Sequence, residues 1–114
     1  MNDLNKETKT HTTFVLERTD KPSLKFEGEL LGTAEGFEGA NELQFFSYSL
    51  YKTKAGKLVC HSKHIDCYTS PDDVVFFGCR IADDISDIID FFGQTCVAHQ
   101  LYANAGIDNF ENID

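Results

Sequence analysis

Apolar and polar residues alternate along the first third of the chain in the pattern of two antiparallel strands. Segments 13–19 and 23–31 are the two predicted strands, and the turn sequence DKPS stands between them. In the second segment, Leu24, Phe26 and Leu30 fall on one face, and charged residues fall on the other. This pattern predicts a first β-hairpin.

A second hairpin is predicted farther along, from residues 43–52 and 57–68. Residues 43–52, LQFFSYSLYK, are rich in the aromatic residues that favour strands. The sequence TKAG that follows predicts a tight turn, because Gly56 can adopt a positive φ. The segment 32–42, rich in glycine and glutamate, is predicted to be a flexible connection between the hairpins. It lacks the lysine and the following helix of a phosphate-binding loop.

From residue 69 onward the pattern changes to that of helices. The sequence TSPDD has the features of a helix start, with Ser70 as N-cap, Pro71 at the first helical position and two aspartates in the first turn. This start favours a short helix for residues 74–78, VVFFG, with a buried strand as the alternative.

Two further helices are predicted after this segment. Residues 83–93 place apolar side chains at helical spacing, and a glycine ends the pattern. The apolar positions are Ile85, Ile88, Ile89 and Phe92. Residues 94–106 predict a last helix that ends at Gly106. Its inward-facing residues are Val97, Leu101 and Tyr102.

These elements predict an α+β fold. A chain of 114 residues supports one domain with a modest core. We expect an antiparallel sheet of about four strands, made of two hairpins, with two to three helices packed on one face. This domain spans residues 13–114, and residues 1–12, which are poor in apolar side chains, form a mobile N-terminal tail. Without a secretion signal or the roughly 18 apolar residues of a membrane span, a soluble, cytoplasmic protein without membrane contact is expected.

The net charge of −9 changes this picture, because it is confined to one part of the chain. Residues 1–64 contain nine acidic and nine basic residues, which cancel, whereas residues 65–114 contain ten acidic residues and only Arg80 as a base. Direct binding of nucleic acid is not expected, since affinity for phosphates comes from Lys and Arg. A basic protein surface is the complementary partner.

Carboxylates on the predicted helices are the candidate partner-binding groups. Asp83, Asp87 and Asp90 recur on the polar face of one helix. The full candidate set is Asp72, Asp73, Asp83, Asp84, Asp87 and Asp90. One version of this hypothesis is an anti-defence inhibitor of phage or plasmid origin, which occupies the site of a nucleic-acid-binding protein with carboxylates in place of phosphates. The plainer interpretation is a solvated helix face that keeps the protein soluble.

The stretch CHSKHIDC, residues 60–67, suggests a metal site or a thiol redox protein as an alternative function. On the predicted strand, however, Cys60 and His64 are roughly 13 Å apart, whereas zinc ligands lie about 2.0–2.3 Å from the ion. Only His64 and Cys67, near the end of the strand, remain candidate ligands, together with a distant cysteine or histidine. No cofactor is predicted, and the four cysteines are expected to be free thiols.

Cys96 and His99 lie on one face of the last predicted helix and could form a thiolate–imidazole pair. The sequence shows no third, orienting group and no other arrangement typical of an enzyme, so no catalytic residue is assigned. A small-ligand binder or enzyme is a further alternative, with the aromatic residues lining a pocket. The exposed edges of a small sheet would also allow two copies to pair as a homodimer.

Several short motifs resemble one known family. They are FEGELLG at 26–32, YKTKAGKLVCH at 51–61, SPDDVVFF at 70–77, DDISDIIDFFG at 83–93 and the ending FENID. The chain resembles the small bacterial family with a C-terminal Glu-x-Leu-Asp-Ile signature. Glu111, Ile113 and Asp114 match the first part of this ending, with isoleucine in place of leucine and no final residue. The family has no assigned activity, so the resemblance implies a bacterial or mobile-element accessory protein and no catalytic residues.

Overall fold

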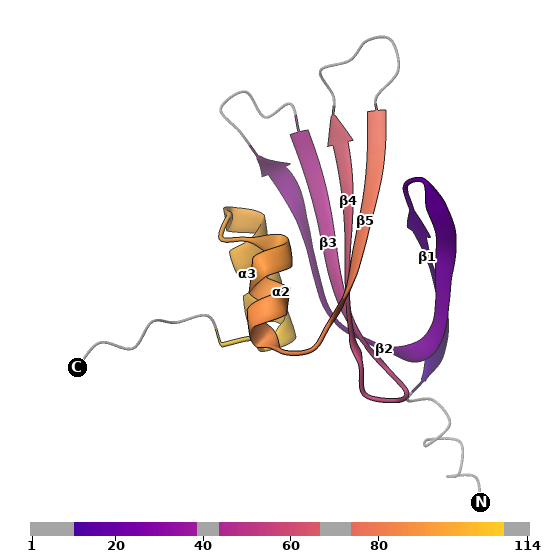
Figure 1. Ribbon diagram of the computed structural model, residues 1–114. Helices are drawn as coiled ribbons and strands as arrows, with labels where there is room; N and C mark the ends of the chain where they lie inside the picture. Colours follow the sequence, from indigo (N-terminus) through magenta and orange to yellow (C-terminus); the bar gives the residue numbers. More distant parts are fainter. Residues whose placement is uncertain (1–10, 39–43, 67–73, 109–114) are drawn as a thin grey trace, which may run out of the picture.

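Five antiparallel strands in sequential order, β1-β2-β3-β4-β5, form one curled sheet, and two helices cover one of its faces (Figure 1). The computed structural model describes residues 11–38, 44–66 and 74–108. The strands are β1 (Thr12–Arg18), β2 (Lys21–Glu38), β3 (Gln44–Thr53), β4 (Leu58–Asp66) and β5 (Val74–Ala82), and the helices are α2 (Ile85–Phe92) and α3 (Cys96–Ala105). The predicted α+β class is confirmed, with one strand more than expected. Among the described residues, no helix is long and apolar enough to cross a membrane.

Strand β2 is long and pairs with β1 along its first part and with β3 along its second part, and the sheet curls along it. Its first part pairs with β1 up to Gly28, and its second part pairs with β3 from the same residue onward. The register shifts between Leu30 and Gly32, and such a bulge bends a strand and increases its twist. Leu30, predicted to share a face with Leu24 and Phe26, stays 47% exposed beside this bulge. The β1–β2 hairpin therefore lies against the face of the sheet opposite the helices (Figure 1).

Two apolar clusters hold these layers together. Beneath the hairpin, Leu16, Tyr51 and Val59 are buried, and Phe14, Leu24, Phe26 and Cys79 pack around them. Under the helices, the sheet contributes Ala34, Tyr48, Leu50, Cys60 and Ala82, and the helices contribute Ile88, Phe92, Val97, Ala98, Leu101 and Tyr102. The predicted inward residues of the last helix, Val97, Leu101 and Tyr102, are confirmed. Each central strand thus buries both of its faces over part of its length.

Contacts from other elements cover parts of the sheet edge at β5 and along the second part of β2. At the β5 edge, the Thr19 N–H donates to the Phe77 carbonyl at 3.1 Å, and Thr19 Oγ1 accepts from the Phe77 N–H at 2.7 Å. At the β2 edge, the Asn104 side-chain amide of α3 donates to the Thr33 carbonyl at 2.8 Å. Such contacts reduce the tendency of an edge strand to pair with another chain.

The prediction of a flexible connection over residues 32–42 is wrong for residues 32–38, which continue β2. Glycine is needed there because α3 lies directly on this strand. A Cβ at Gly32 would lie 2.8 Å from the Ala105 Cβ, and one at Gly36 would lie 3.2 Å from Val97 Cγ2. The glycines that suggested a loop are therefore the residues that let a helix approach the sheet. Residues 39–43 lie outside the described residues.

The preference for a short helix at residues 74–78 is also wrong, because these residues begin strand β5. They pair in antiparallel register with β4, with Phe77 opposite Lys63 and Val75 opposite Ile65. Valine and phenylalanine favour strands, and an available neighbour strand overrides a local helix-start signal. The predicted start itself, at Ser70 and Pro71, lies outside the described residues, as does most of the predicted N-terminal tail.

Candidate interaction surface

Two of the predicted binding carboxylates hold the start of helix α2. Asp84 is its N-cap, and Asp84 Oδ1 accepts from the Asp87 N–H at 3.0 Å. Asp87 Oδ2 in turn accepts from the Asp83 N–H at 2.9 Å. These bonds satisfy backbone donors that a helix start leaves without partners. Asp84 and Asp87 therefore have a structural role in this chain.

A third carboxylate ties α2 to the sheet. Asp90 Oδ2 accepts from Arg80 Nη1 of β5 at 3.1 Å, and the guanidinium lies 5.7 Å from the centre of the Phe91 ring. The two charged side chains are 42% and 75% exposed, so solvent weakens this ion pair. Among the described residues, the Asp83 carboxylate is exposed and has no such contact. Asp72 and Asp73 lie outside the described residues.

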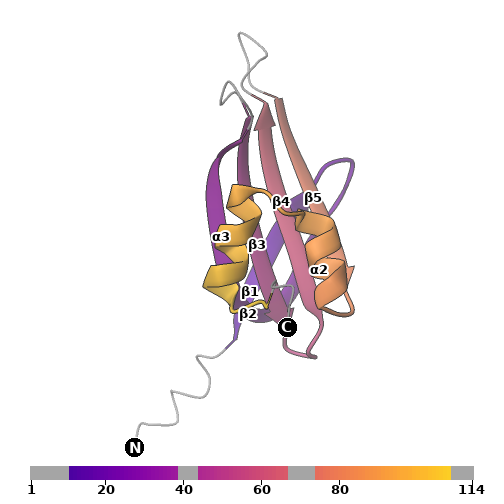
Figure 2. The same ribbon diagram turned by 90° about the vertical axis from the view of Figure 1, so that its left-hand side faces the viewer.

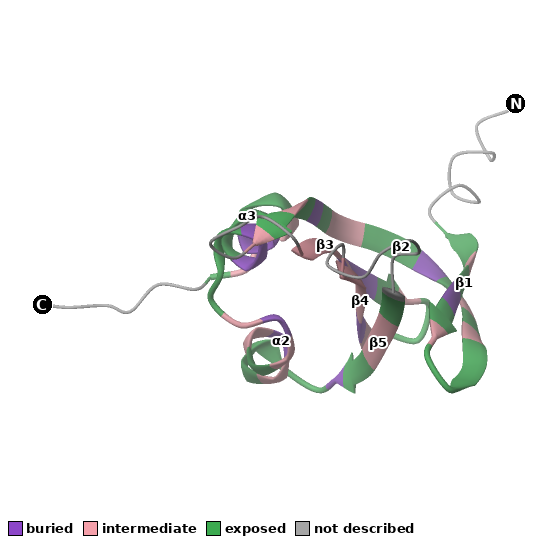
Figure 3. Cartoon of the chain, turned by 90° about the horizontal axis from the view of Figure 1, so that it is seen from above, coloured by how far each residue is buried: buried purple, intermediate pink, exposed green. Residues whose placement is uncertain are grey.

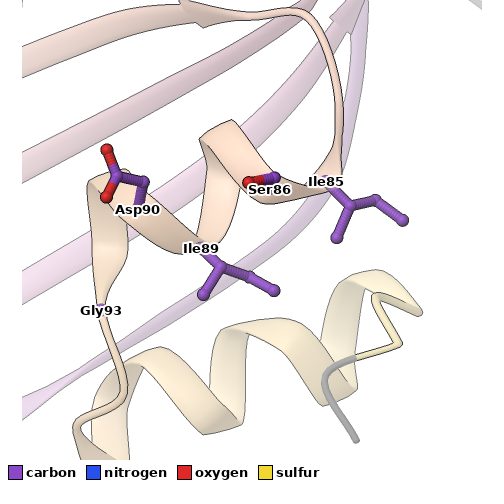
Figure 4. A pocket seen from close by; sticks show the side chains of 5 residues that line it. All are labelled: Ile85, Ser86, Ile89, Asp90 and Gly93. Atoms are coloured by element: carbon purple, nitrogen blue, oxygen red, sulfur yellow. The ribbon is translucent and has the colours of Figure 1, made fainter. Parts of the chain in front are cut away.

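Helix α2 presents an apolar groove along one side. The groove has a volume of about 610 Å³ and is open to solvent. Its lining residues are Ile85, Ser86, Ile89, Asp90 and Gly93. Figure 4 shows that Ile85 and Ile89 point toward α3, and that Asp90 points away from it. Ile85 is 44% exposed at the start of the apolar face of α2, whereas Ile88 and Phe92, farther along the same face, are buried in the core.

The helical layer around this groove contains aspartates and no lysine or arginine. Residues 83–108 contain five aspartates and neither lysine nor arginine. Both helices lie side by side over the same face of the sheet (Figure 2), and exposed residues line their outer sides (Figure 3). The nearest described base, Arg80, is already paired with Asp90. The layer therefore combines an apolar groove with negative charge of a single sign.

Comparison with known proteins does not extend this description. The chain matches no family model, no curated protein and no solved structure.

The cysteines and histidines of CHSKHIDC are not gathered at one point. Cys60 is fully buried on the face of β4 under the helices. His61 lies on the opposite face, where its Nε2 is 2.7 Å from the Glu17 carbonyl oxygen. His64 stacks on Phe46, with 4.4 Å between ring centres, and Cys67 lies outside the described residues. Within residues 11–38, 44–66 and 74–108, no group of three potential ligands could hold a metal ion.

His64 has an unusual environment for a polar side chain. Its ring lies between Phe46 and Phe76, whose ring centre is 5.9 Å away. The Nε2 atom is buried and has no hydrogen-bond partner within the part of the chain that the structure describes. A buried polar atom without a partner is unfavourable by roughly 1–3 kcal/mol. The stretch therefore contributes His64 to a half-buried aromatic stack across β3, β4 and β5.

Two of the described thiols, Cys60 and Cys79, lack the features of a redox or nucleophilic centre. Burial, followed by the nearby Cys79, raises the pKa of Cys60 to about 12, and burial also raises the pKa of Cys79. Both therefore stay protonated at neutral pH, whereas nucleophilic cysteines are thiolates. Cys96 is exposed at the start of α3, and the His99 ring is hydrogen-bonded to Gln94 at 2.7 Å.

The sequence reasoning missed the groove, because it assigned Ile85 to the same inward face as Ile88 and Ile89. A helix of eight residues that packs on a sheet through Ile88 and Phe92 leaves its first residue at the rim. The ion pair of Arg80 with Asp90 is also not predicted from the sequence. It depends on β5 being a strand beside α2, whereas a helix was expected there.

Proposed function

We propose that the chain is a non-enzymatic interaction protein that docks its helical layer, α2 with α3, onto a basic protein partner. The observation that carries this proposal is the open apolar groove of Ile85 and Ile89 in a layer without lysine or arginine. Apolar contacts at the centre and charges at the rim are the usual arrangement of a protein interface. Negative charge of one sign selects a positively charged partner and accelerates its association.

The arrangement of the carboxylates favours general docking over imitation of a nucleic acid. A phosphate mimic needs carboxylates that are free to meet the partner's basic side chains. Asp84 and Asp87 instead accept hydrogen bonds from backbone N–H groups at the start of α2. The proposed partner is therefore a basic protein that places apolar side chains in the groove.

Affinity capture from a lysate of the encoding organism tests this proposal with charge variants. The test variant carries Asp83→Asn with Asp90→Asn, which removes two charges from the helical layer and leaves the helix cap of Asp84 and Asp87 intact. The matched control carries Glu29→Gln with Glu35→Gln, the same change of charge at two exposed positions of β2. Capture is compared at about 0.15 M and about 1 M salt, where the Debye length falls from about 8 to about 3 Å.

The expected result is a protein that the wild type and the control retain at the lower salt concentration. The test variant should release it, and so should the wild type at about 1 M salt. Equal retention by the test variant and the control would contradict the proposal. Retention that is unaffected by about 1 M salt would also contradict it.

A further inference from the structure

We infer that the groove along α2 receives an amphipathic helix of the partner, with an apolar side chain on each turn and with lysine or arginine on its flanks. This inference rests on the proposed function and specifies the part of the partner that binds. Three properties of the groove support it: its length, its lack of a strand edge and its charge.

The length of the groove matches a short stretch of helix. The lining residues run from Ile85 to Gly93, and eight residues of helix rise about 12 Å. That is about two turns, so two or three apolar side chains of an occupant helix, at i, i+3 or i+4 and i+7, would contact the groove. At Gly93 a Cβ would meet no atom within 4 Å, so the groove stays open at this end.

The hydrogen bonding of α2 disfavours an extended peptide. An extended segment usually binds by adding a strand to a sheet edge, where unpaired N–H and C=O groups are available. The groove is lined by one helix and offers no strand edge, and at its end the Gly93 N–H donates to the Ile89 carbonyl at 2.7 Å. A helical occupant satisfies its own backbone and needs only apolar side chains for the groove.

The charge of the layer defines the flanks of the occupant. Asp90 lines the groove, Asp83 is exposed at the start of the helix, and no basic residue occurs from residue 83 to residue 108. Lysine or arginine beside the apolar side chains would meet these carboxylates. An acidic amphipathic helix, or a second copy of this layer, would bring like charges together.

A designed peptide tests the inference on the full chain. The probe is a synthetic helix of about five turns with leucine on one face and lysine elsewhere. One reference peptide has glutamate in place of lysine, and another has alanine in place of leucine. Titration calorimetry measures the affinity for the wild type, for Ile85→Ser and for the matched control Ile81→Ser. Ile81 is 46% exposed on β5, close to the 44% of Ile85, and does not line the groove.

The expected result is that Ile85→Ser weakens binding of the leucine–lysine helix about tenfold, as the loss of one buried isoleucine contact implies. Ile81→Ser should stay within about twofold of the wild type, and the glutamate peptide should not bind. For the alanine peptide, the wild type and Ile85→Ser should no longer differ. Shifts of the Ser86 and Gly93 amide resonances, measured by NMR, locate the contact independently.

Equal affinities of Ile85→Ser and Ile81→Ser would overturn the inference, and so would binding of the glutamate peptide. A wild-type dimer that Ile85→Ser converts to monomer would overturn it as well, since a second copy would then occupy the groove. These results are separable from a failure of the proposed function. If Asp83→Asn with Asp90→Asn still releases the captured partner but Ile85→Ser does not, the result supports docking through the helical layer. It contradicts the binding of a partner helix in the groove.

Discussion

Arg80 of β5 and Asp90 of α2 form an ion pair at 3.1 Å that joins the sheet to the helix next to it. The only base among residues 65–114 therefore lies beside the acidic layer, where it neutralises one carboxylate without entering the helices. The pair is largely exposed, so it fixes position more than it adds stability. Asp90 lines the groove, so the ion pair sets the charge at one rim, beside the exposed Ile85.

The two neighbouring aspartates at the start of α2 should respond differently to substitution. Asp84→Ala removes the helix cap and should lower the free energy of unfolding by about 1 kcal/mol. Asp83→Ala removes only an exposed carboxylate and should change it by less than about 0.5 kcal/mol. Urea denaturation measures both. Equal losses for the two variants would contradict the cap geometry.

The glycines of β2 should be sensitive to even one added methyl group, in a defined order. In Gly32→Ala, the new Cβ would meet the backbone nitrogen of Ala105 at 2.8 Å, so α3 itself must move. We expect a loss of roughly 1–3 kcal/mol in the free energy of unfolding. In Gly36→Ala, the nearest atom is a Val97 methyl group at 3.2 Å, which can shift, so the loss should be smaller. The reverse order in urea denaturation would count against this packing.

The comparison of these glycines with Gly56 shows what the sequence could predict. Gly56 has a φ of 95° in the β3–β4 turn, as its place between two alternating segments predicts. The ends of α2 and α3 at Gly93 and Gly106 were equally predictable, because the helix and its stop signal are adjacent in the sequence. Gly32 is glycine because of Ala105, a residue far along the chain, and no local pattern contains that information.

The same distinction applies to the candidate surface. The line of aspartates on α2 was visible in the sequence, and its position on an exposed helix follows from the period of the apolar residues. Which carboxylates are already bonded could not be predicted, since the Asp90 contact depends on where β5 places Arg80. The exposure of Ile85 likewise depends on how a short helix sits on the sheet.

His64 and His61 should show opposite effects when replaced by phenylalanine. His64→Phe keeps a ring between Phe46 and Phe76 and removes a buried nitrogen without a partner, so it should raise the free energy of unfolding by about 1 kcal/mol. His61→Phe loses the contact with the Glu17 carbonyl and should lower it by a similar amount. Thermal or urea denaturation compares the two. A loss of stability in His64→Phe as large as that in His61→Phe would refute this interpretation.

Alkaline pH should unfold the protein through buried acids. Burial raises the pKa of Cys60 from 9.0 to about 12, and that of Tyr102 from 10.0 to about 12. Both groups are neutral when protonated, and the folded chain holds these protons more tightly than the unfolded chain. The free energy of unfolding is therefore highest below about pH 9 and falls as the pH rises toward 12.

Urea midpoints from pH 8 to 11 test this, and Tyr102→Phe should show a shallower decline above pH 10. Identical slopes would contradict it.

The most direct test of the central claim is to identify the carboxylates that touch the partner in the complex. A carbodiimide joins a carboxylate to a lysine amine only where the two are in contact, and mass spectrometry identifies the joined residues. Docking through the helical layer predicts links from Asp83 and Asp90 to lysines of the captured protein, with few from Glu29 and Glu35 of the sheet. Links that arise from Glu29 and Glu35 and spare α2 would show that the protein binds through another face.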